Sequence, residues 1–190
     1  MGNSYTNLTL RGPDPSAVAE ALKGRSAFIT PKQNNCVVVL DEESDAQDLD
    51  ALSRLAQDLS SKLSCPTLAV MNHDDDVLLY ALYDNGVLVD EYNSSPDYFE
   101  DGPSRPPESG DAETLCIHFK AENRDAVEQI LRRPQGTEDG YIFAVERHQD
   151  LIAALGLPSI AAGLGYRYAR EGDFPDDLED EDLLRLDSDG

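Results

Sequence analysis

The segment Val77–Tyr83, together with the Asn85-Gly86 pair that follows it, constrains the fold of this chain more than any other stretch. Its residues, VLLYALY, are all apolar or aromatic, so an extended segment here is apolar on both faces. Such a strand belongs inside a sheet that is covered on both sides. Asn and Gly tolerate positive φ, so Asn85-Gly86 predicts a two-residue hairpin turn to a second strand beginning at Val87.

The turn also predicts how the two strands pair. The expected partners are Asp84 with Val87, Tyr83 with Leu88, Leu82 with Val89, Ala81 with Asp90, and Leu79 with Tyr92. A third apolar run, Thr67–Met71, precedes the hairpin, with a short polar turn between them. The chain centre is therefore interpreted as three consecutive antiparallel strands.

The residues before this unit predict alternating strands and helices. Strands are expected at 5–10, 26–30 and 36–40, with a short helix after Pro15. Ser44 and Gln47 suggest a capping box for a helix over 46–63, whose buried stripe comprises Leu49, Leu52, Leu55, Leu59 and Leu63. The order up to residue 98 is β-α-β-β-α-β with an added hairpin. It predicts an α+β fold with a ferredoxin-like antiparallel sheet.

The chain divides into four parts on composition. Residues 1–99 form the sheet domain, and 100–111, rich in Pro, Gly and acids, form a linker. Residues 112–172 form a helical region expected to pack on the sheet, with its longest helix at 141–155. Residues 173–190 are an acidic tail, in which Leu183, Leu184 and Leu186 suggest a short docked helix.

The charge balance limits the possible partners. The 190 residues include 15 Lys and Arg against 38 Asp and Glu, a net charge of −23. Such a charge repels nucleic acids and anionic membranes and attracts basic proteins. We expect a cytoplasmic protein, because no signal peptide or membrane span is evident and the three cysteines suit a reducing compartment. No cofactor is expected, and the oligomeric state is left open.

A polar and aromatic cluster follows the central hairpin. Tyr92, Asn93, Asp97 and Tyr98 are the candidate binding residues, because loops at strand ends often carry sites and tyrosine suits interfaces. The alternative is a structural exit loop whose tyrosines pack and whose polar groups satisfy the backbone.

The turn 73–76 is the weak candidate for a metal site. His73, Asp74 and Asp76 offer a ring nitrogen and carboxylate oxygens, but the spacing lacks the glycine and glutamate of a calcium-binding EF-hand. A solvated acidic turn is the preferred interpretation, so no metal is predicted.

Two further patterns lie in the helical region. Glu146, Arg147 and His148 offer an acid-base group, although an exposed ion-pair face is the preferred interpretation. Residues 150–170 have the outline of a helix-turn-helix in which Ser159 caps the second helix. Gly163 and the acidic tail argue against it, and a packed helical corner is preferred.

Three segments carry a resemblance: ALYDNGVLVDEYNSSPDYF (81–99), ERHQDLIAALGLP (146–158) and GYRYAREGDFP (165–175). They resemble segments in a group of uncharacterised bacterial proteins of similar length. The resemblance implies a bacterial cytosolic protein and implies no activity.

Three functional hypotheses follow. The first is a non-catalytic acidic protein that binds a basic macromolecule, as an immunity protein or inhibitor does. The second is a small enzyme or ligand-binding protein with a site near residues 92–98, assisted by His73 or His148. The third is a DNA mimic with its acids spaced like phosphates.

Overall fold

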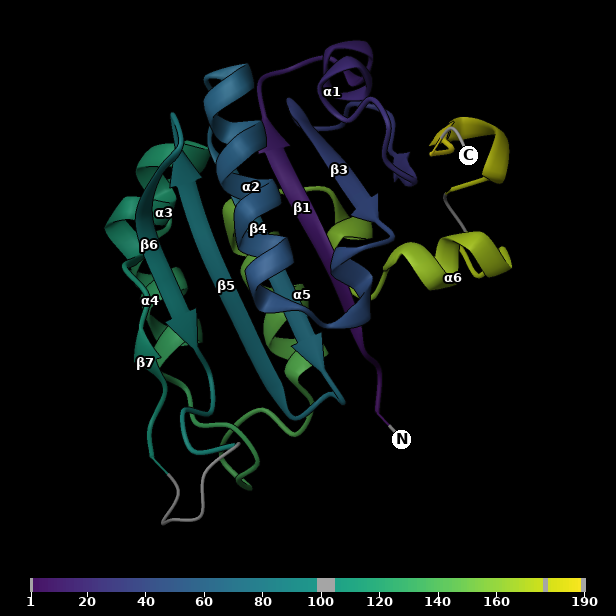
Figure 1. The fold of residues 1–190 in the computed structure, drawn as a ribbon. Coiled ribbons are helices and arrows are strands. Elements are labelled where there is room, and N and C mark those ends of the chain that lie inside the picture. The colour runs from purple at the N-terminus through teal and green to yellow at the C-terminus, as the bar shows by residue number, and fades with distance from the viewer. Residues whose placement is uncertain (1, 99–104, 176–177, 189–190) are drawn as a thin grey trace.

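The computed structural model describes residues 2–98, 105–175 and 178–188. The described residues form a mixed α+β fold around one eight-stranded sheet (Figure 1). All pairs of neighbouring strands in this sheet are antiparallel. The strand order is β7-β6-β5-β4-β1-β3-β2-β8. The strands are β1 (Tyr5–Arg11), β2 (Ala27–Ile29), β3 (Cys36–Asp41), β4 (Thr67–His73), β5 (Val77–Asp84), β6 (Val87–Asn93), β7 (Glu108–Ser109) and β8 (Leu184–Leu186).

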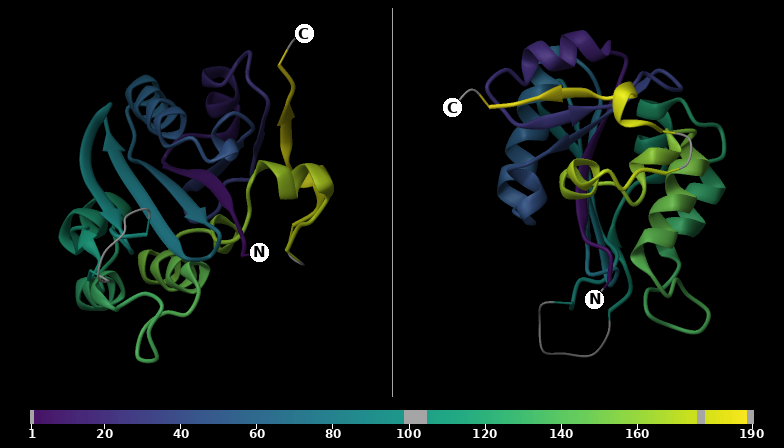
Figure 2. Two further views of the ribbon diagram at one scale, coloured as in Figure 1. Left: turned by 60° about the horizontal axis from the view of Figure 1, so that its bottom comes forward. Right: turned by 90° about the vertical axis from the view of Figure 1, so that its right-hand side faces the viewer.

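Helices cover both faces of this sheet. The α-helices are α1 (Pro15–Ala21), α2 (Leu49–Leu63), α3 (Ala112–Phe119), α4 (Arg124–Arg132), α5 (Ala144–Leu155) and α6 (Tyr166–Glu171), and short 3₁₀ turns are η1 (Ser44–Ala46), η2 (Ser159–Ala161) and η3 (Asp180–Asp182). In the side view of Figure 2, α1 and α2 lie on one side and α3, α4 and α5 on the other. Within the described residues, no helix combines the length and apolar character needed to cross a bilayer.

The apolar character of β5 on both faces explains why the sheet is covered twice. Leu78 and Leu82 belong to the core beneath α3, α4 and α5. Tyr83 belongs to the second core, beneath α1 and α2, and Leu79 and Ala81 pack against the edge of that core. The two-faced interpretation of this strand is therefore confirmed, and its side chains alternate between the two cores.

The central hairpin forms at the predicted turn, but its register changes along the strands. Asp84 pairs with Val87 and Tyr83 with Leu88, as expected. Beyond that point the predicted partners are wrong by one residue: Leu82 pairs with Asp90 instead of Val89. A β-bulge causes the shift, because an extra residue on β6 moves every later pair.

Two helix starts differ from expectation. The Ser44 and Gln47 capping box is wrong: Ser44 belongs to η1, and α2 begins at Leu49, where the Asp48 carboxylate accepts from the Asp50 and Ala51 amides. Helix α5 begins at Ala144 rather than at residue 141. The first error arises because Ser44 and Asp48 both precede the helix and compete to accept its free amides. At α5 the N-cap position is Phe143, and Glu146 within the helix accepts from the Ile142 and Phe143 amides instead.

Strands formed by segments outside the expected sheet domain lie at its two edges. Glu108–Ser109, assigned from composition to the linker 100–111, is β7, and residues 100–104 of that linker lie outside the described residues. Leu184–Leu186 pairs with β2 as strand β8, so the expected short helix at these leucines is wrong. The open edge of β2 offers unpaired backbone groups, which favours an extended conformation.

Candidate functional site

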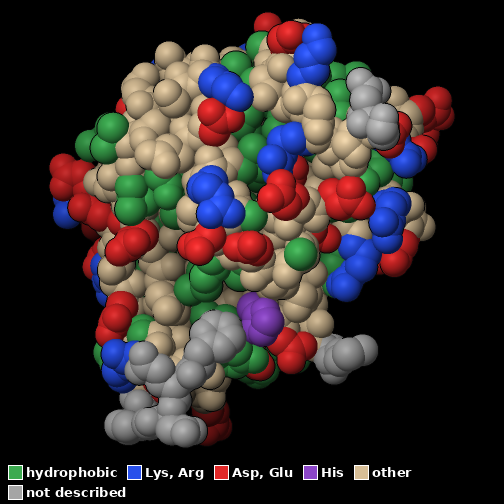
Figure 3. Space-filling view, viewed as in Figure 1, with side chains coloured by type: hydrophobic (Ala, Val, Ile, Leu, Met, Phe, Trp, Pro, Cys, Tyr) green, Lys and Arg blue, Asp and Glu red, His purple; other side chains and the backbone are tan. Residues whose placement is uncertain are grey.

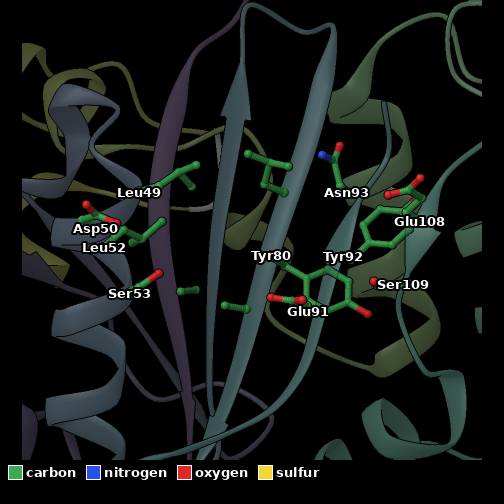
Figure 4. A pocket seen from close by; sticks show the side chains of 13 residues that line it. Leu49, Asp50, Leu52, Ser53, Tyr80, Glu91, Tyr92, Asn93, Glu108 and Ser109 are labelled. Atoms are coloured by element: carbon green, nitrogen blue, oxygen red, sulfur yellow. The ribbon is translucent and has the colours of Figure 1, made fainter. Parts of the chain in front are cut away.

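A groove lies where the helical layer formed by α1 and α2 ends and the sheet continues beyond it. Helix α2 packs on β4 and β5, and β6 and β7 extend the sheet past its first half. This leaves a depression with a volume of about 390 Å³ between α2 and β7. Figure 4 shows the α2 side chains on one side and the β6 and β7 side chains on the other. This depression is called the α2–β7 groove below.

The floor of the α2–β7 groove is apolar and made largely of small side chains. Ala69 of β4 and Ala81 of β5 lie at its base, beside Leu79. Leu49 and Leu52 of α2 form one wall. Leu49 was expected in the buried stripe of α2, but its side chain is 44% exposed. A ligand seated here would therefore remove apolar surface from water, which is favourable.

The rim of the groove is acidic on both sides. Asp50 lies on the α2 side, and Glu91 and Glu108 lie on the strand side. All three are exposed, and among the described residues none that lines the groove is Lys, Arg or His. Arg105 does not line the groove, but its Nη1 lies 3.4 Å from Oε1 of Glu108 and forms an ion pair with it. Figure 3, which shows the face carrying α2, has both acidic and basic side chains interspersed with exposed hydrophobic ones. The groove therefore suits a ligand that is both apolar and cationic.

The candidate binding residues divide between the two faces of the sheet. Asn93 lies opposite Leu79 and lines the groove, where its Oδ1 also accepts from the Ser95 amide. The Tyr92 ring is buried against Tyr80 in the other core, and its hydroxyl donates to the Leu131 carbonyl in α4. Neighbouring residues of a strand point to opposite faces, so these two side chains cannot meet.

The remaining two candidates contact the nearby loops. The Asp97 carboxylate accepts from the Arg105 amide at 3.1 Å. The Tyr98 hydroxyl donates to Asp76, and its ring meets His73 edge-on at 5.8 Å between centroids. The structure thus brings Tyr98 together with the 73–76 turn rather than with Tyr92.

The 73–76 turn holds the start of the chain in place. The Asp74 carboxylate accepts from the Gly2 amide, and Asp75 accepts from the Asn3 amide. His73 Nδ1 lies 3.0 Å from the Gln47 side-chain oxygen. In the described residues no group of three or more His, Cys, Asp or Glu side chains is arranged to hold a metal ion.

Arg147 is fully buried, so its expected place on an exposed ion-pair face is wrong. Its guanidinium donates to the carbonyls of Ile130, Leu131, Arg133 and Pro134 and stacks 4.6 Å from the Tyr141 ring. These carbonyls lie at the end of α4, where helical partners run out and the negative end of the helix dipole favours a cation. Burial lowers the pKa of Arg147. The residue caps α4 from a neighbouring helix.

His148 is also buried rather than exposed. Its Nδ1 lies 2.7 Å from the Tyr5 hydroxyl, and the two rings stack at 5.8 Å. Burial lowers the pKa of His148 to about 3, so the ring is neutral at physiological pH. Glu146 accepts from the amides of Ile142 and Phe143 at the start of α5. These contacts give the three residues structural roles and do not assemble an acid-base pair.

The helix-turn-helix outline at 150–170 is not formed, because no continuous second helix begins at Ser159. After α5 ends at Gly156, the chain forms the three-residue η2 and then the separate six-residue α6. Ser159 therefore starts a 3₁₀ turn, not a recognition helix. The preferred expectation of a corner is consistent with this, since glycines at 163 and 165 separate the two pieces.

The acids of the groove were not singled out from the sequence. The relevant signal was the alternation along the second hairpin strand, which places Glu91 and Asn93 on one face. That signal identifies a face but not whether a helix covers it. Only the position of α2 on the folded sheet brings Leu49 and Asp50 to the same depression as Glu91 and Asn93.

Comparisons with known proteins add nothing to this geometry: no protein-family model matches the chain, and neither the curated proteins nor the solved structures gave a match. The resemblance to bacterial proteins therefore stays an expectation.

Proposed function

We propose that this protein is a non-catalytic binding protein that holds a basic polypeptide in the α2–β7 groove, in the manner of an immunity protein or inhibitor. The observation that carries the proposal is the combination of an apolar floor with acids on both rims and no basic lining residue. The net charge of −23 acts in the same direction at long range. A cytoplasmic location suits such a role.

The two features of the groove have different effects on binding. Exposed ion pairs contribute about 0.2–1 kcal/mol each, so Asp50, Glu91 and Glu108 together contribute about tenfold in affinity. Burying apolar surface contributes about 25 cal/mol per Å², so the floor adds stabilisation in proportion to the area that the ligand covers. The acids also accelerate association and select partners by charge. A partner with Lys or Arg around an apolar patch satisfies both requirements.

The fold offers a suitable frame for this role, and we propose that its β1–β4 part is of the ferredoxin-like type. The antiparallel order β4-β1-β3-β2 and the placement of α1 and α2 on one face support this. Strands β5, β6 and β7 then extend that frame, and their exposed face forms the groove.

The test compares two variants of equal charge. The first carries Asp50→Asn, Glu91→Gln and Glu108→Gln, and the second carries Glu122→Gln, Glu138→Gln and Asp139→Asn at exposed positions outside the groove. The probe is a synthetic peptide of Leu and Lys, followed by fluorescence anisotropy. We expect the groove variant to weaken binding about tenfold more than the control. Equal weakening by both variants would mean that only net charge attracts the peptide, and the proposal would be rejected.

A further inference from the structure

The α2–β7 groove has the dimensions of a missing helix in the layer that contains α1 and α2. Beyond β4 the sheet continues through β5, β6 and β7, and strands lie about 4.8 Å apart. From β5 to β7 the sheet spans two strand spacings, or about 10 Å, which matches the helix diameter of about 10–12 Å. The second half of α2 reaches β6 only at its start, where Gln57 and Ser60 bond Gly86 of the turn. In the described residues no helix covers the rest of β6 or β7 on this face (Figure 1).

We infer that the occupant of the groove is a basic amphipathic α-helix from another protein, which lies alongside α2 as a third helix of that layer. This inference rests on the proposed function and specifies the form of the partner.

The need to satisfy backbone hydrogen bonds favours a helix over an extended peptide. The strands beneath the groove are paired on both sides, β5 with β4 and β6, and β6 with β7 at Tyr92 and Asn93. An extended peptide lying across this face would find few backbone partners over the apolar floor, and each unpaired buried group is costly. A helix pairs its own backbone groups internally.

The side chains of the floor also suit a helix. Ala81 of the floor and Ser53 of the α2 wall are small and partly exposed, so the axis of an incoming helix can approach α2 to the usual helix-packing distance of about 8–10 Å. Leu49 and Leu79 are only partly covered and offer contacts to larger side chains. An apolar stripe at positions i, i+3, i+4 and i+7 would face this floor.

The charges define the flanks of that helix and exclude a second copy of this chain. Asp50 lies on one side of the groove, and Glu91 and Glu108 lie on the other. A helix with Lys or Arg on both borders of its apolar stripe complements both rims. A second copy would instead bring another net charge of −23 to an acidic rim.

The experiment uses the full chain and three peptides of about 14 residues, or about four helical turns. The first has a Leu stripe with Lys on both borders. The second has the same composition with the stripe scrambled, and the third alternates Val and Lys as an extended probe. Affinity is measured by fluorescence anisotropy, and helix formation on binding by circular dichroism.

The variant Ala81→Leu fills the floor, and Ala17→Leu makes the same change at an exposed position of α1. We expect the striped peptide to bind about tenfold more tightly than the other two and to become helical. Ala81→Leu should remove that preference, and Ala17→Leu should preserve it.

The outcomes separate the two proposals. If the scrambled or extended peptide binds as well as the striped one, and the groove charge variant still weakens all three, the helix inference is overturned while the proposed function stands. If no peptide responds to the groove charge variant more than to its matched control, both are overturned. Tighter binding of the striped peptide that ignores Ala81→Leu overturns the helix inference, because the helix then lies elsewhere.

Discussion

The Tyr5 hydroxyl lies 2.7 Å from Nδ1 of His148, so a buried hydrogen bond joins the first strand to α5 across 143 residues. This contact holds helix α5 against the centre of the sheet. It also buries the titratable His148 ring, and burial disfavours the protonated form of that ring.

His148 should make the protein less stable as the pH falls. Burial lowers its pKa from 6.5 to about 3, so between these values the unfolded chain binds a proton that the folded chain does not. Its contribution is complete above pH 6.5 and decreases toward pH 3, with a maximum slope of about 1.4 kcal/mol per pH unit. We expect His148→Gln to show a shallower decrease in the free energy of unfolding when urea denaturation is repeated across this range.

Burial also raises the pKa of Asp45 and Asp90, which acts in the opposite direction. Both carboxyls are present in the wild type and in His148→Gln, so the difference in slope isolates the histidine. Parallel stability curves for the two proteins would contradict the assignment.

Arg147→Lys should destabilise the fold strongly. A lysine ammonium cannot reproduce the planar fork that donates to four carbonyls at the end of α4, so some of these buried acceptors lose their partner. The expected loss is about 2–4 kcal/mol in the free energy of unfolding, measured by urea denaturation. Arg124→Lys, at an exposed ion pair, should change it by less than about 0.5 kcal/mol. Similar values for both variants would show that the buried guanidinium does not stabilise α4.

Gly86→Ala should destabilise the central hairpin more than a comparable change elsewhere. Gly86 has a φ of +78°, where an L-residue costs about 1–2 kcal/mol, and an added Cβ would lie 2.9 Å from the Ser61 Cβ. Gly136 has a φ of +69° and no atom within 4 Å of such a Cβ, so Gly136→Ala carries the backbone strain alone. Thermal denaturation should give Gly86→Ala the lower Tm. Equal Tm values would argue against the close approach of α2 to the turn.

Removing β8 should expose the edge of β2. A chain that ends at Asp182 lacks the pairs of Ala27, Phe28 and Ile29 with the tail. We expect faster hydrogen exchange in β2 and a Tm lower by about 2–4 °C for each kcal/mol lost. A chain that ends at Ser188 keeps β8 and serves as the control. Unchanged exchange in the shorter chain would mean that the tail does not protect this edge.

Several local features could be predicted from the sequence because their causes lie within a few residues. Asn85 and Gly86 both have positive φ and form the predicted turn. The Asn123 side chain caps α4, and Gly156, with a positive φ, ends α5. These signals reflect the conformational preference of a residue and its immediate neighbours, which the chain order contains. The apolar run of β5 likewise determined that the sheet has two covered faces.

Other features depend on residues distant in the chain and only the tertiary structure decided them. The same local sequence around Arg147 is compatible with an exposed or a buried helix face, and the position of the α4 carboxyl end makes it buried. The leucines of the acidic tail suggested a short docked helix, yet the open edge of β2 holds Leu184–Leu186 as a strand.

The candidate site shows the same division. Asn93 could be predicted from its place after the hairpin, whereas the groove exists only because the first half of α2 covers β4 and β5 and leaves the far ends of β6 and β7 uncovered. Sequence periodicity determined which face of each element is apolar. How far one layer extends over another follows from packing between segments separated by tens of residues, so Asp50 and Glu108 meet at one groove only in the folded protein.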